Sequence, residues 1–327
     1  MEGYSAYDIE RGDSRASSTE HPHGVLPYRV NRPLGIVLYY GLDWLATIAI
    51  GITCYFSQLG THTERFYLET DYSFMYPYHE DTISVALLAV LGCVVPIIIV
   101  IFVEAFFFWR MRAWPVVLDM HHFALSFFQA HTLVQLITIV LKRYVGRLRP
   151  SAFARQTDSI GGWNEAYPSG HTSMIFTGMI FLALFLSGKF GVFSSHGILS
   201  SIGPIRQADP FRGSYILGLL FVVAPVSLAL YVATSRLVDY AHDFSDVNAG
   251  AVLGAFGAWF AYNLSYPSIS DPRSALPRPL AHLHRFEKDW IQYYLCKVGT
   301  AENNMPLQSA PRRTSEAEMA GLDRERS

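Results

Sequence analysis

Charged side chains are scarce in this chain of 327 residues. Lys, Arg, Asp and Glu together make up 16% of it, whereas hydrophobic residues make up 51%. This composition is too apolar for an ordinary soluble domain. The formal net charge is only -2 and no long basic block occurs, which argues against nucleic acid as a partner.

Cysteine is scarce as well. Cys54, Cys93 and Cys296 are far apart in the sequence, so they indicate neither a disulfide framework nor a zinc site. Residues 1–27 are polar and lack the apolar core of a cleavable signal peptide. We therefore expect the first membrane span to act as the insertion signal.

Long apolar runs, by contrast, are abundant. A helix crosses the bilayer with about 20 mostly apolar residues. Six segments are candidates, the fourth being short: Leu34–Phe56, Ile83–Phe108, Phe123–Leu141, Thr172–Leu186, Ser214–Ala233 and Val247–Tyr266. The sequence therefore predicts an all-α fold, a transmembrane bundle of six helices over residues 34–266.

The segments outside the predicted bundle are mostly polar. We expect a disordered cytosolic head over residues 1–33 and a disordered cytosolic tail over residues 303–327. Between bundle and tail, the juxtamembrane segment 267–302 carries apolar residues at helical spacing: Leu283, Phe286, Trp290 and Tyr294. This spacing indicates a short amphipathic helix, which lies either on the membrane surface or against the cytosolic ends of the spans.

The distribution of Lys and Arg predicts the orientation. Most of these residues lie in the head, in the tail and in the loops after the second and fourth spans; Lys189 belongs to the loop after the fourth. We therefore expect these segments to face the cytosol. The loop between the third and fourth spans breaks the rule, because alternation places it outside although it is basic: Lys142, Arg143, Arg147, Arg149 and Arg155. These charges are explained if they hold an anion.

Acids inside spans are functional candidates by default. Asp43 lies in the first span and Glu104 near the cytosolic end of the second. Because Glu104 is close to that end, its side chain has a plainer alternative, which is to reach the headgroup region.

Three polar clusters stand at span ends that alternation places on one side of the membrane. The first is KRYVGRLRP over residues 142–150, the second is PSGH over residues 168–171, and the third is SRLVDYAHDFSD over residues 235–246. Four helix ends would therefore meet in one patch.

Such a patch suits a phosphate group. Arg149 and Arg236 offer planar forks of donors, Lys142 adds a point charge and Ser169 adds a hydroxyl. Gly170 lets backbone N–H groups approach the anion at a helix start, where the helix dipole favours negative charge.

Two histidines in the same patch supply a reaction. His242 and Asp246 are four residues apart, so on a helix the carboxylate would fix the imidazole tautomer through Nδ1–H. Nε2 is then free to attack phosphorus. His171, across the pocket, would protonate the leaving oxygen and later activate water.

Taken singly, each cluster has a plainer explanation. Lys142 and Arg143 would anchor a span end at the headgroups, PSGH would be an ordinary turn and cap, and His242 with Asp246 would be a surface pair. Because all three clusters are expected on the same side of the membrane, a shared functional site explains them better than three separate structural roles.

The three clusters resemble the signature of the type 2 phosphatidic acid phosphatase superfamily: Lys, six residues, Arg-Pro; Pro-Ser-Gly-His; and Ser-Arg, five residues, His, three residues, Asp. All eleven specified positions are present in order. GRLRP at 146–150 and SRLVDYAHDFSDVNAG at 235–250 are similar to its lipid phosphate phosphatase branch.

The resemblance implies roles for these residues. His242 would be the nucleophile, Asp246 its orienter and His171 the general acid. A larger set would hold phosphate oxygens: Lys142, Arg149, Ser169, Gly170 and Arg236. The family also implies no metal ion or other cofactor, six spans, and an active site on the extracytoplasmic or lumenal side with both termini in the cytosol.

The predicted function is hydrolysis of lipid phosphates, such as phosphatidic acid, lysophosphatidic acid and diacylglycerol pyrophosphate, through a phosphohistidine. Alternatives within enzymes are a sphingoid-base phosphate phosphatase, a polyprenyl pyrophosphate phosphatase and a lipid phosphotransferase. A membrane transporter is the alternative from another class. The expected partners are the lipid substrate and the bilayer, and self-association as a homo-oligomer stays open.

Overall fold

The structure is a computed structural model that describes residues 33–111, 115–193, 215–271, 274, 277 and 278. The chain divides into two compact units, Met1–Asp43 and Trp44–Ser327, and every predicted site residue lies in the second. Nearly all of the predicted head, the whole tail and the predicted amphipathic helix lie outside the described residues.

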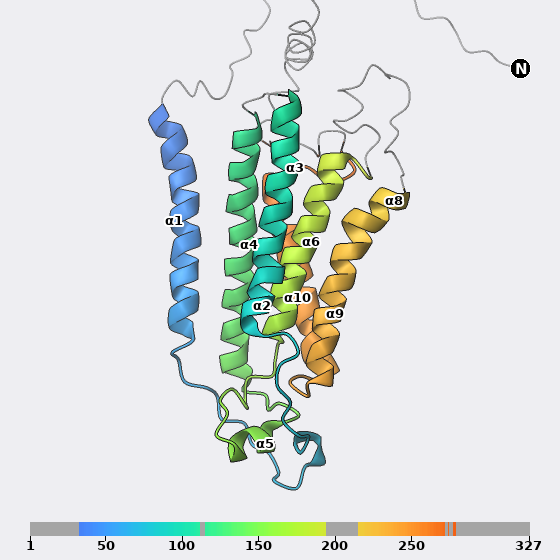
Figure 1. Cartoon of the computed structure of the whole chain (residues 1–327). Coiled ribbons are helices and arrows are strands. Elements are labelled where there is room, and N and C mark those ends of the chain that lie inside the picture. The colour runs from blue at the N-terminus through green and yellow to red at the C-terminus, as the bar shows by residue number, and fades with distance from the viewer. Residues whose placement is uncertain (1–32, 112–114, 194–214, 272–273, 275–276, 279–327) are drawn as a thin grey trace, which may run out of the picture. The chain divides into compact units, whose positions relative to one another are not determined.

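Within the described residues, each predicted span falls in a helix or a continuous helical run, except for at most two residues at one end (Figure 1). The long elements are α1 (Pro33–Ser57), the continuous run α2 (Val85–Ala89), η2 (Val90–Val94) and α3 (Val95–Met111), then α4 (Pro115–Val145), α6 (Gly170–Phe190), the run α8 (Tyr215–Gly218), η3 (Leu219–Val223) and α9 (Ala224–Val238), and α10 (Phe244–Ser265). Two short helices, η1 (Tyr72–Phe74) and α5 (Ala152–Thr157), lie in loops. The all-α fold is confirmed.

Four helical segments among the described residues are long and apolar enough to cross a membrane: Val85–Phe106, Asp119–Val145, Gly170–Phe190 and Ile216–Val238. The helices α1 and α10, of 25 and 22 residues, are not among them. Polar residues of α10, Asp246, Asn248 and Asn263 among them, lower its mean hydropathy. The count of six spans therefore stays a prediction.

Helix α6 lies at the centre of the second unit and packs on α4, α9 and α10. Three of its large apolar side chains, Ile175, Met179 and Phe181, are fully buried. Small residues let α10 approach closely, as in many membrane bundles. A Cβ atom on Gly250 would lie 2.6 Å from the carbonyl oxygen of Ser169, so this glycine brings the start of α10 against the start of α6.

A buried ion-pair cluster joins the other ends of these helices. Lys189 of α6 lies 2.5 Å from Glu104 of α3 and also contacts Asp119 of α4, to which the hydroxyl of Tyr266 donates a hydrogen bond of 2.7 Å. Lys189 therefore belongs to the helix and not to the following loop, and Glu104 points inward and not to the headgroups. The placement of Lys189 in the loop and the plainer alternative for Glu104 are wrong, because each side chain finds an opposite charge inside the bundle. A functional role of Glu104 stays a prediction.

Candidate active site

The three polar clusters of the sequence meet at one end of the second unit. Helix α4 ends there, α6 begins there, and the connection from α9 to α10 turns there, beside α5 (Figure 1). The backbone N–H of Ser169 donates to the carbonyl of Asp246 at 3.0 Å, which ties the second cluster to the third. The structure thus brings together the four helix ends that the sequence predicted.

His242 is buried with one ring nitrogen fixed. Its Nδ1–H donates a hydrogen bond of 2.7 Å to the carbonyl oxygen of Ala166. A backbone carbonyl only accepts hydrogen bonds, so the proton must reside on Nδ1 in the neutral ring. The lone pair of Nε2 is therefore the one available for chemistry.

Asp246 does not make the hydrogen bond that the sequence predicted. Its Oδ2 lies 3.7 Å from Nδ1 of His242, which is close enough for attraction but too long for a hydrogen bond. Instead Oδ2 accepts from the backbone N–H of Asp243 at 3.0 Å, closing the capping box of α10, and Oδ1 accepts from Arg147 at 2.9 Å. The carboxylate is fully buried, and the carbonyl of Ala166 takes over its expected role.

The surroundings of His242 favour its neutral form. Burial lowers the pKa of its imidazole well below the usual range, and the positive charges of Arg149, Lys142 and Arg236 lower it further. A neutral imidazole is the nucleophilic form. The same cations therefore suit an incoming anion and keep the ring unprotonated before it arrives.

Lys142 and Arg149 reach the site from the third predicted span and the loop after it. The Lys142 ammonium donates to the carbonyl of Glu165 at 2.7 Å, and the Arg149 guanidinium donates to the carbonyls of Gly162 and Ala241 at 2.7 and 3.3 Å. Burial and nearby cations lower the pKa of Arg149 to about 10, so it stays charged at neutral pH. Backbone acceptors thus orient both cations without neutralising them.

Arg236 is the most deeply buried of these cations. Only 1% of its surface is exposed. One terminal nitrogen donates to Asp239 at 3.1 Å and the other to Asp81 at 2.9 Å, while Nε has no hydrogen-bond partner among the described residues. A buried donor without a partner is costly, and a phosphate oxygen would satisfy it.

Ser169 and Gly170 form the N-terminus of α6. The hydroxyl oxygen of Ser169 accepts from the backbone N–H of Thr172 at 3.4 Å and from its hydroxyl at 3.0 Å, which makes Ser169 the helix cap. The Ser169 hydroxyl proton is not used in these contacts. The first N–H groups of a helix have no acceptor within the helix, so those of Gly170 and His171 suit an anion here.

His171 is held from the opposite side by a loop. Its Nε2–H donates to the carbonyl of Ile83 at 3.1 Å, which by the same reasoning leaves Nδ1 as the nitrogen with a free lone pair. Thus each of the two site histidines has one nitrogen fixed by a backbone carbonyl and one nitrogen left for proton transfer or attack.

The remaining basic residues of this loop have structural partners. Arg143 donates to the carbonyl of Gly60 at 2.9 Å, and Arg155 donates to that of Gly161 at 3.3 Å. Arg147 pairs with Asp243 at 2.7 Å as well as with Asp246. Nearby carboxylates offset the charges of Arg147 and Arg143, the latter 3.6 Å from Glu165. That the five charges act together on an anion stays a prediction.

Sequence reasoning missed several residues of the site. The carbonyl of Ala166 offers no side-chain signal, and Asp81 lies far from the clusters in the sequence. Arg147 was noticed only as a loop charge. Asp239 stands within SRLVDYAHD, three residues after Arg236, so helical spacing is the one signal that would have indicated a pair.

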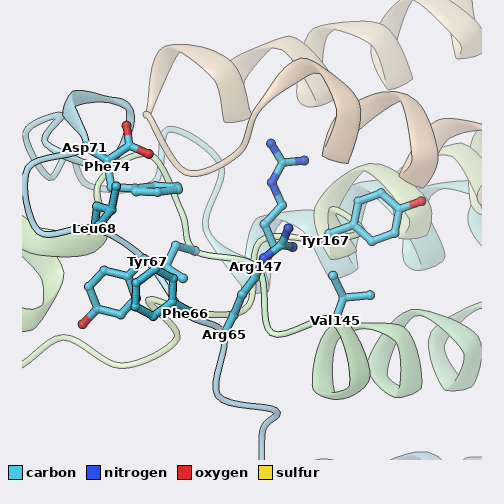
Figure 2. A pocket seen from close by; sticks show the side chains of 10 residues that line it. Arg65, Phe66, Tyr67, Leu68, Asp71, Phe74, Val145, Arg147 and Tyr167 are labelled. Carbon is cyan, nitrogen blue, oxygen red and sulfur yellow. The ribbon is translucent and has the colours of Figure 1, made fainter.

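Two pockets open at this end of the unit. The first, of about 560 Å³, is shown in Figure 2 and combines aromatic and basic side chains: Arg65, Phe66, Tyr67, Leu68, Asp71, Phe74, Val145, Arg147, Leu148 and Tyr167. The second, of about 460 Å³, is mainly apolar: Leu141, Tyr167, Pro168, Asn248, Ala249, Val252, Leu253 and Phe256. Tyr167 lines both, so a pocket of mixed character and a mainly apolar pocket adjoin it. No set of three His, Cys, Asp or Glu residues suited to a metal ion occurs among the described residues.

Comparison with known proteins now assigns the family. Residues 123–270 match the model of the PAP2 superfamily, and this part of the chain belongs to that superfamily, as the motifs predict. With its long apolar helices the chain is an integral membrane protein. No solved structure matches it.

Named relatives agree with this family. The chain is 37% identical over 51% of its length to a PA-phosphatase related-family protein of Dictyostelium discoideum, of which 57% is covered. Two Arabidopsis thaliana proteins, probable lipid phosphate phosphatase 4 and lipid phosphate phosphatase 1, are 29% and 30% identical over 72% and 59% of the chain. The match covers 75% of the former and 58% of the latter. The chain therefore spans less than two thirds of the Dictyostelium protein and of lipid phosphate phosphatase 1.

The contacts of Arg147 lead to a prediction. Arg147→Gln removes the charge that offsets buried Asp246, so we expect the protein to lose about 2 kcal/mol of stability and the start of α10 to loosen around His242. The midpoint of thermal unfolding in detergent and the rate of phosphate release measure the two effects. Arg147→Lys, which keeps the charge without the fork, should be intermediate. Wild-type behaviour of Arg147→Gln would contradict the assignment.

Proposed function

We propose that the protein is a lipid phosphate phosphatase that hydrolyses phosphatidic acid and related lipid phosphate monoesters without a metal ion. The proposal rests on the surroundings of His242, which is buried. The carbonyl of Ala166 binds Nδ1 and leaves Nε2 free, and three cations are close enough to depress the pKa of the ring. The names of the relatives support the substrate class.

The first chemical step is a displacement at phosphorus. Lys142, Arg149 and Arg236 hold the phosphoryl oxygens and offset the charge of the transition state. The lone pair of Nε2 of His242 forms the bond to phosphorus as the bond from phosphorus to the ester oxygen breaks. For this step His171 must be protonated at Nδ1 as well as at Nε2. Its Nδ1–H proton passes to that oxygen, and the lipid alcohol departs.

The second step returns the enzyme to its starting state. His171, now neutral, takes a proton from a water molecule whose oxygen attacks phosphorus. The bond between phosphorus and Nε2 breaks, its electron pair returns to His242, and inorganic phosphate leaves. Asp246 supports the imidazole electrostatically and holds the start of α10.

Tyr167 lines one pocket with basic and aromatic side chains and one that is mainly apolar, and this pair of pockets suits an amphipathic substrate. The apolar pocket along α4 and α10 would take part of an acyl chain, while the basic residues lie toward the loops. Lysophosphatidic acid and diacylglycerol pyrophosphate are among the proposed substrates. A sphingoid-base phosphate or a polyprenyl pyrophosphate would share this chemistry, and a phosphotransferase would replace water by another alcohol.

We propose the topology together with the function. Six spans over residues 34–266 would place the catalytic end on the extracytoplasmic or lumenal side, with the head 1–33, the juxtamembrane segment 267–302 and the tail 303–327 in the cytosol. The distribution of Lys and Arg in the loops supports this orientation.

The activity has a direct test. Purified protein in mixed micelles should release phosphate from phosphatidic acid in the presence of a chelator, and His242→Ala should lose the activity almost completely because the attacking nitrogen is gone. His121→Ala, a change in a histidine of α4 that is remote from the site clusters in the sequence, is the matched control. Full activity of His242→Ala would exclude the mechanism, and phosphate transport that survives loss of both His171 and His242 would favour a transporter.

The role of His171 has a test of its own. A general acid contributes about a hundredfold or more when the leaving group is poor. We therefore expect His171→Ala to slow release from phosphatidic acid far more than release from 4-nitrophenyl phosphate, whose leaving group needs no proton. Equal losses on the two substrates, compared as kcat/KM, would show that another group is the acid.

A further inference from the structure

Three consecutive residues ahead of α2 contact the site, although they lie outside its sequence motifs. Asp81 pairs with Arg236 at 2.9 Å, the backbone N–H of Thr82 donates to Asp239 at 3.0 Å, and the carbonyl of Ile83 accepts from His171 at 3.1 Å. The segment therefore touches a phosphate-binding cation, the second acid on that cation, and the expected general acid. It also lies outside residues 123–270, which match the family.

Neighbouring contacts fix this segment in place. The backbone N–H of Tyr76 donates to the carbonyl of Pro150 at 3.1 Å, and the rings of Tyr76 and Tyr240 stack at 4.8 Å. The guanidinium of Arg155 lies 4.8 Å from the ring centre of Tyr78. Asp81 is thus held beside Arg236 by the fold of the loop and not by the ion pair alone.

Asp81 carries its negative charge at neutral pH. Burial opposes ionisation, but the hydrogen bond from Arg236 and its positive charge outweigh burial and hold the pKa of the Asp81 carboxyl below its usual range. The charge of Arg149 acts in the same direction. The carboxylate is therefore an anion that stands where the cations of the site converge.

The two acids on Arg236 differ in their freedom. Asp239 is buried and is held by both the backbone and the hydroxyl of Thr82, whereas the side chain of Asp81 is 30% exposed. A phosphate that takes the unpartnered Nε of Arg236 approaches a guanidinium that Asp81 already shares. Like charges at such short range repel strongly when they are partly desolvated.

We propose that Asp81 is a specificity-determining residue that competes with the phosphoryl group for Arg236 and thereby weakens the binding of inorganic phosphate. This inference rests on the proposed function of the same site. Arg236 already pairs with two carboxylates, Asp81 and Asp239. Inorganic phosphate, the product, lacks the lipid part that contributes apolar contacts. Its binding therefore depends most on charge, and Asp81 promotes its release and limits product inhibition.

The test is direct binding of inorganic phosphate to the full-length protein in detergent, measured by isothermal titration calorimetry without turnover. Asp81→Asn, which keeps the shape of the side chain and removes its charge, should bind phosphate about tenfold more tightly than wild type. The gain in affinity is no larger because solvent at the partly exposed side chain screens the repulsion. Glu80→Gln, the same loss of charge at the exposed neighbouring residue, should leave the dissociation constant unchanged. Asp81→Glu should stay close to wild type.

The outcomes separate competition from a positioning role. If Asp81 only orients Arg236, Asp81→Asn will bind phosphate as wild type does or more weakly, and either result overturns the proposal. Should Asp81→Asn fail to fold, Asp81→Ser removes the same charge and is judged by the same criterion. Tighter phosphate binding by protein that hydrolyses no lipid phosphate would uphold the role of Asp81 and refute the proposed function.

Discussion

The hydrogen bond from Nδ1–H of His242 to the carbonyl of Ala166, 2.7 Å long, is the contact on which the rest of the site depends. It fixes the tautomer that leaves Nε2 free. The backbone N–H of Ala166 donates in turn to the carbonyl of Arg147 at 2.9 Å, and the side chain of Arg147 binds Asp246 at 2.9 Å. The nucleophile, the segment before α6 and the start of α10 therefore form one closed set of contacts.

The cations of the site are oriented before a substrate arrives. Lys142 and Arg149 donate to backbone carbonyls, and Arg236 is shared by two carboxylates. Preorganised charge of this kind stabilises a transition state without reorganisation at the moment of reaction. It also depresses the pKa of His242, so the feature that attracts phosphate also keeps the nucleophile in its reactive form.

Much of this arrangement was predictable from the sequence, because it rests on spacing along helices. The apolar runs predicted the helices, and the three motifs predicted which helix ends meet. The sequence could not show that a backbone carbonyl would replace Asp246 at Nδ1, because a carbonyl has no residue-specific pattern. Nor could it place Asp81 beside Arg236, since that pair depends on the path of the loop before α2. Lys189 was misread because its partners, Glu104 and Asp119, come from other helices.

The central claim is that Nε2 of His242 becomes phosphorylated. The most direct measurement is rapid acid-free quenching of the protein during turnover of phosphatidic acid labelled in its phosphate, followed by identification of the labelled residue. A phosphoryl group should appear on His242, where it is stable in base and labile in acid, and it should be absent from His242→Asn. Label on another residue, or undiminished label in His242→Asn, would contradict it.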